Sequence, residues 1–62
     1  MGFLDLFRNN ALYYNNKGIE LLNKDFYHEA LKFFNKALKI HPDSDEIRYN
    51  RAITYWKLGK YH

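Results

Sequence analysis

Small and apolar residues recur every three or four positions along most of this chain, a spacing that gathers them on one face of a helix. The first set comprises Ala11, Tyr14, Gly18, Leu21 and Leu22. The second set comprises Tyr27, Ala30, Leu31, Phe34, Ala37 and Leu38. The third set is broader, which indicates two buried faces, and comprises Ile47, Tyr49, Ala52, Ile53, Tyr55, Trp56 and Leu58. The pattern therefore predicts three amphipathic helices.

Residues that start or stop helices separate these sets. Asn9 and Asn10 divide the first helix from a short apolar leader, and Asp25 is the predicted N-cap of the second helix. Pro42 cannot continue a helix, so the second helix should end near Ile40.

The third helix has start and stop signals of its own. Asp43 or Ser44 should cap it, because both residue types accept hydrogen bonds from the first free backbone amides. Gly59 is a common residue just past a helix end, so this helix should run to about Leu58.

The third helix repeats the character of the first helix at an offset of 34 residues. With this offset Gly18 falls on Ala52, and Leu22 falls on Trp56. Most of the agreement lies at small and apolar positions. The chain therefore contains an internal repeat.

Five residues of the first unit stand in a specific frame, and they are Gly18, Ala30, Phe34, Ala37 and Pro42. In this frame residues 11–44 resemble the tetratricopeptide repeat family, whose period is about 34 residues. Small residues let two antiparallel helices approach closely, the aromatic ring fills the space between them, and proline forces a turn. The start of a second unit shows similar residues, which are Asn50, Ala52, Tyr55, Gly59 and Tyr61.

The resemblance implies an all-α fold made of antiparallel helix-turn-helix repeats, as in a fragment of an α–α superhelix. Three ranges follow from it. Residues 1–10 are an apolar leader, expected to form a short N-terminal helix; residues 11–44 are one complete repeat; residues 45–62 are the first helix and turn of a truncated second repeat. The chain should thus hold about one and a half repeats, with three main helices.

Composition narrows the class of protein. With 47% hydrophobic and 19% aromatic residues, the 62-residue chain is too apolar for a disordered tail. It has no cysteine, so a partner chain is the expected source of extra stability. No apolar run is long enough for a membrane span, and the start lacks a basic secretory leader. We expect a soluble, cytoplasmic protein that does not bind membranes.

The sequence contains no recognisable catalytic, cofactor-binding or metal-binding motif. The chain has no glycine-rich phosphate loop and no nucleophile motif, so we expect it not to be an enzyme and to need no cofactor. His28 and His41 lack neighbours at metal-ligand spacing, so no metal site is predicted. Acidic residues cluster after Pro42, but the start of a helix explains them.

In the tetratricopeptide family the first helix of each pair lines an inner, concave surface, which implies a groove for a peptide or helix of a partner protein. The resemblance assigns to this groove Leu12, Asn15, Ile19, Leu22, Asn23, Glu46, Tyr49, Asn50, Ile53, Trp56 and Lys57. Asn15 and Ile19 stand where members that grip chaperone tails carry lysine and asparagine, so that specialisation is not expected. The predicted function is a protein-interaction scaffold.

Self-association is also predicted. The third helix lacks the helix that would normally cover it, and the leader has four large apolar side chains that must dock within the chain or on a neighbour. The residues expected to mediate association are Phe3, Leu6, Phe7, Ala52, Tyr55 and Tyr61.

A helical nucleic-acid binder, with RNA as the ligand, is the rival class. The net charge of +3 is mild, but Lys32, Lys36 and Lys39 form a basic stripe along the second helix. A solvated outer face explains the stripe more simply. Nucleic-acid binding should weaken steeply with salt and on removal of these lysines. Peptide binding should depend instead on Tyr49, Ile53 and Trp56.

Overall fold

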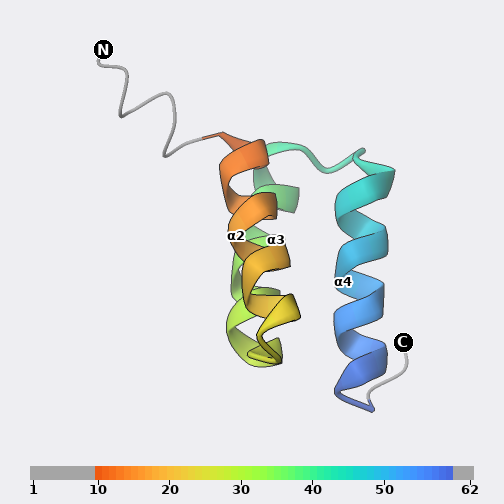
Figure 1. The fold of residues 1–62 in the computed structure, drawn as a ribbon. Coiled ribbons are helices and arrows are strands. Elements are labelled where there is room, and N and C mark those ends of the chain that lie inside the picture. The colour runs from red at the N-terminus through yellow and green to blue at the C-terminus, as the bar shows by residue number, and fades with distance from the viewer. Residues whose placement is uncertain (1–9, 60–62) are drawn as a thin grey trace.

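The computed structural model describes residues 10–59 of the chain. This part contains three α-helices, which are α2 (Ala11–Asn23), α3 (Tyr27–Ile40) and α4 (Asp45–Lys57). In Figure 1, α2 and α3 form an antiparallel hairpin, and α4 runs in the same direction as α2. The predicted all-α fold and its three main helices are confirmed. The expected leader helix lies outside the described residues.

Side-chain caps fix the starts of α2 and α4. The Asn10 side chain accepts a hydrogen bond of 2.7 Å from the backbone amide of Leu12. The Ser44 hydroxyl accepts one of 3.2 Å from the backbone amide of Ile47, so Ser44 rather than Asp43 is the cap of α4. Each bond satisfies an amide that has no partner within the helix.

The turn between α2 and α3 differs from the prediction for Asp25. This residue does not cap α3, whose N-cap is Phe26 without any side-chain cap bond. Instead Asp25 has a φ of 67°, in the left-handed region. The amides of Asp25 and Phe26 donate back to the carbonyls of Leu22 and Leu21, at 3.1 and 2.9 Å. This is the Schellman closure of a helix, which requires a left-handed residue, and aspartate tolerates that conformation better than most residues do.

The core of the hairpin centres on Phe34, which is fully buried together with Ala30 and Ala37 on α3. Gly18 of α2 lies directly against this ring, since a Cβ atom added at Gly18 would be 2.5 Å from Phe34 Cε1. The absence of a side chain at position 18 is therefore what allows α2 and α3 to approach each other around Phe34.

The third helix packs on α3 through one of its sides. Ile47 is 4% exposed and belongs to the same apolar cluster as Phe34, and Thr54 is fully buried. On this side Arg51 donates a hydrogen bond of 3.0 Å to the Asn35 side chain of α3. Ala52, which repeats the position of Gly18, is exposed because no described helix covers it.

Candidate protein-binding face

Two asparagines join the sides of α2 and α4 that face each other. Asn50 Nδ2 donates a hydrogen bond of 3.0 Å to Asn15 Oδ1, and Asn15 Nδ2 donates one of 3.3 Å to Glu46 Oε2. Residues three or four positions apart lie on the same face of a helix. The residues at such steps from Asn15 on α2 and from Glu46 on α4 therefore lie on the same surface as this contact. We call this surface the inner face, and its residues are Leu12, Ile19, Leu22, Asn23, Glu46, Tyr49, Ile53, Trp56 and Lys57.

Large apolar side chains of the inner face are open to solvent. Leu12 is 63% exposed, Tyr49 is 67% exposed and Trp56 is 63% exposed. Ile19, Leu22 and Ile53 are half-buried, and Asn23 and Lys57 are exposed. Exposed anchors of this size, backed by half-buried aliphatic residues, are typical of surfaces that bind other proteins.

Asn15 needs a correction as a predicted groove residue. It is 3% exposed and both ends of its amide are bonded to α4, so its side chain has no free polar group to offer a partner. Asn50, which donates to Asn15 in this bridge, is half-buried. Sequence reasoning missed this bridge, although a polar residue between Leu12 and Ile19 on an otherwise apolar stripe was a signal for it.

A hollow of about 320 Å³ opens where α2 and α4 begin. Leu12 and Asn15 line it on the α2 side, His41 and Ser44 on the loop side, and Glu46 on the α4 side. Since Asn15 holds one oxygen of the Glu46 carboxylate, that negative charge is positioned at the wall of the hollow. The hollow lies at the end of the molecule where Figure 1 shows the loop crossing from α3 to α4.

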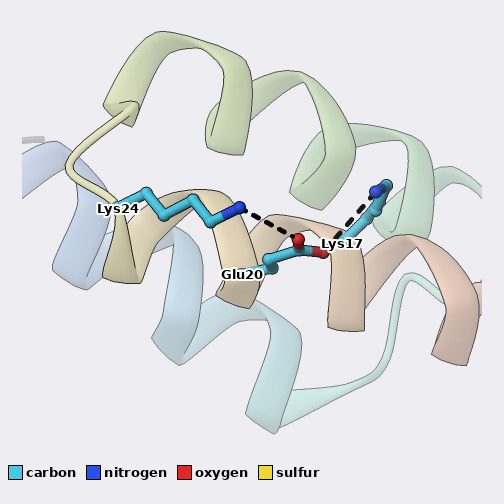
Figure 2. A network of polar contacts seen from close by, with 3 residues as sticks. All are labelled: Lys17, Glu20 and Lys24. Atoms are coloured by element: carbon cyan, nitrogen blue, oxygen red, sulfur yellow. Dashed lines mark hydrogen bonds and ion pairs between the residues drawn. The ribbon is translucent and has the colours of Figure 1, made fainter.

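A group of charged residues occupies another face of α2. Figure 2 shows Lys17 and Lys24 reaching Glu20 from opposite directions along the helix, with Nζ–Oε distances of 3.5 and 3.3 Å. The hydrogen bond from Lys24, followed by the charge of Lys17, lowers the pKa of the Glu20 carboxyl from its usual value of 4.5. We call these three residues the charge ladder.

The 34-residue repeat shows which residues of α4 stand at the positions equivalent to the charge ladder. At the 34-residue offset, Lys17 and Glu20 correspond to Arg51 and Thr54, which lie on the side of α4 that packs on α3. The corresponding side of α2 carries exposed charge instead. The two ends of the stack of helices are therefore chemically different.

One lysine of the basic stripe of α3 contacts aromatic rings. Lys36 Nζ lies over the rings of Tyr14 and Phe33, 5.6 and 5.5 Å from their centroids, and both rings are half-buried. Lys32 and Lys39 are exposed. The stripe therefore has charge but offers no open ring for base stacking.

Two further features are absent from residues 10–59. No cluster of three or more potential metal ligands occurs there. None of the helices in this range has the length and apolar character that crossing a membrane requires.

Known proteins resemble this chain over most of its length. It is 39% identical over 51 residues to an uncharacterised protein of Methanocaldococcus jannaschii, which covers 82% of this chain and 59% of that protein. It is 40% identical over 43 residues to the Hsp70-Hsp90 organizing protein of Triticum aestivum, covering 69% of this chain and 7% of that one. It is 34% identical over 58 residues to the peroxisomal targeting signal receptor of Kluyveromyces lactis, and this match covers 94% of this chain and 10% of that one.

The chain thus spans about three fifths of the first relative and a tenth or less of the other two. No solved structure matches it. The family model for the TPR repeat matches residues 24–59, which is more than half of the chain. Together with the helical hairpin and its Gly18–Phe34 contact, this match shows that the chain belongs to the tetratricopeptide (TPR) repeat family, whose domains generally mediate protein–protein interaction.

Proposed function

We propose that the inner face binds a peptide or helix of a partner protein, and that the chain acts as a non-catalytic scaffold. The observation that carries the proposal is the exposure of Leu12, Tyr49 and Trp56 on one surface. Tyrosine and tryptophan supply large contact areas at low entropic cost, so exposed rings of this kind dominate binding energy at interfaces.

The names of two relatives are consistent with this proposal. One denotes an organizing protein of Hsp70 and Hsp90, and the other denotes a receptor for a targeting signal. The first name describes a protein that organizes others, and the second describes a receptor. The rival RNA-binding function lacks similar support, because the two most exposed rings, Tyr49 and Trp56, belong to α4, whereas the rings that Lys36 contacts are half-buried.

Selection of peptides from a displayed random library against the intact chain would test the proposed function. Selected peptides should bind Trp56→Ala about thirtyfold more weakly than the wild type, since loss of an anchoring ring costs about 2 kcal/mol. Lys36→Ala is the matched control on the basic stripe and should bind them normally. Equal binding to all three proteins would contradict the proposal, as would tight, salt-sensitive binding of single-stranded RNA that depends on Lys36.

We also propose that the chain associates with itself through the uncovered side of α4. Ala52 is exposed and Tyr55 is half-buried there, whereas the equivalent Gly18 and Leu21 of α2 face α3. The other residues predicted for association, Phe3, Leu6, Phe7 and Tyr61, lie outside the described part of the chain.

Sedimentation velocity over a range of concentrations tests self-association. The wild type should form a dimer as concentration rises, and Ala52→Glu should shift it towards monomer, because the change places a charge on the uncovered side. Asn16→Glu, an exposed change on α2, is the control and should leave the distribution unchanged. A monomer at every concentration would exclude self-association.

A further inference from the structure

The inner face carries opposite charges at its two ends. Glu46 is in the first turn of α4 and Lys57 is its last residue, so they are about three helical turns, or roughly 16 Å, apart. Three full turns return to nearly the same side of a helix, which places both charges on one stripe. Both side chains are exposed, and within residues 10–59 neither forms an ion pair.

The carboxylate of Glu46 is positioned for an external group. Asn15 holds its Oε2 atom, and Asn15 is itself fixed by Asn50, so the carboxylate is held in place although it is exposed. The hollow of about 320 Å³ beside it leaves room for the aliphatic part of a long basic side chain. Asp45 adds a second negative charge at this end of α4.

Between the two charges the inner face is apolar. Tyr49, Ile53 and Trp56 follow Glu46 at steps of three and four residues, so they form a continuous strip that ends beside Lys57. A partner helix lying along this strip would place its apolar stripe on the rings. Its charged residues would then meet Glu46 at one end and Lys57 at the other.

We propose that the partner segment is an amphipathic helix that carries a basic residue at the Glu46 end of its apolar stripe and an acidic residue at the Lys57 end. The proposal rests on the binding function proposed above and specifies the chemistry and the direction of the ligand. A helix with acidic residues near its N-terminus and basic residues near its C-terminus is intrinsically favoured, so the partner should lie antiparallel to α4.

Four synthetic helical peptides of about 18 residues, or five turns, test this arrangement. They share one apolar stripe and differ only at two positions three turns apart, which hold glutamate and lysine, two lysines, two glutamates or two glutamines. Binding is followed by the fluorescence of Trp56, which is the single tryptophan of the chain. The glutamate–lysine peptide should bind the wild type about threefold to tenfold more tightly than the glutamine peptide at low salt, and equally at about 1 M salt.

Charge-reversed variants should change the preference in a defined way. Glu46→Lys should prefer the peptide with two glutamates, and Lys57→Glu should prefer the peptide with two lysines. Glu46→Gln keeps an oxygen that can accept the Asn15 hydrogen bond, so it serves as the second variant should Glu46→Lys unfold, and it should lose the preference for the basic end. Asn16→Lys is the control on α2 and should bind as the wild type does.

The outcomes separate this inference from the proposed function. If the glutamine peptide binds and all four peptides bind alike, the charge arrangement is wrong and the binding function stands. If no peptide binds, both fail. If the charge reversals alter the sedimentation of the chain alone and leave peptide binding unchanged, a second copy occupies the inner face and the inference is overturned.

Discussion

At the scale of single residues, Gly18 has no room for a side chain. A methyl group at this position would overlap the buried Phe34 ring, so Gly18→Ala should destabilise the fold by about 1–3 kcal/mol despite the better helix propensity of alanine. Thermal unfolding followed by circular dichroism should show a melting temperature lower by several degrees.

Two comparisons make the Gly18 prediction specific. Asn16→Ala, an exposed change on the same helix, should not lower the melting temperature. Adding Phe34→Leu to Gly18→Ala should cost less than the sum of the single changes, because the smaller side chain makes room for the methyl group. An unaffected Gly18→Ala protein would mean that α2 and α3 are not in close contact there.

At Asp25 the opposite substitution, to glycine, is expected to stabilise the fold. Its left-handed backbone conformation costs an ordinary residue roughly 1–2 kcal/mol and costs glycine almost nothing. Asp25→Gly should therefore raise the urea midpoint slightly, even though it removes the 2.9 Å hydrogen bond that Tyr27 Oη donates to Asp25. Asp25→Ala removes the same bond without relieving the backbone and should lower the midpoint. A fall with both variants would show that the Tyr27 contact matters more than the turn.

At the scale of elements, the charge ladder makes the stability of α2 depend on pH. Folding lowers the pKa of Glu20, so its contribution is present above pH 4.5 and is lost as the pH falls through the lowered value. Wild type should be slightly more stable than Glu20→Gln at neutral pH, and the two should converge under strongly acidic conditions. Urea unfolding across this range measures the difference.

The lysines provide the control for this pH dependence. A chain that carries both Lys17→Gln and Lys24→Gln lacks both partners of Glu20 in the charge ladder. In that chain, replacing Glu20 by glutamine should not change how stability depends on pH under acidic conditions. A difference that persists in this background would assign the effect to another partner of Glu20.

The helices could be predicted from sequence more fully than the contacts between them. Pro42, Ser44 and Gly59 act on their own segments, so local signals placed the helix ends to within a residue or two. Asp25 was misassigned because a short turn uses the same residue types as an N-cap. The Asn15 bridge depends on how α4 lies against α2, which no local pattern specifies.

At the scale of the whole molecule, stability should depend on concentration. A chain of this size buries little surface, so burying the uncovered side of α4 in a dimer would add a large fraction of the total stability. The melting temperature of the wild type should therefore rise with protein concentration, and that of Ala52→Glu should rise less. Calorimetry at several concentrations gives the measurement, and a constant melting temperature for the wild type would contradict the proposed association.

The charge ladder also limits what association can build. A filament grows without end only when each added subunit offers a fresh adhesive surface at the opposite pole. Here that pole carries Lys17, Glu20 and Lys24, whose burial under another helix would require stripping water from three charges. If the chain associates through α4 as proposed, growth should therefore stop at closed, finite assemblies.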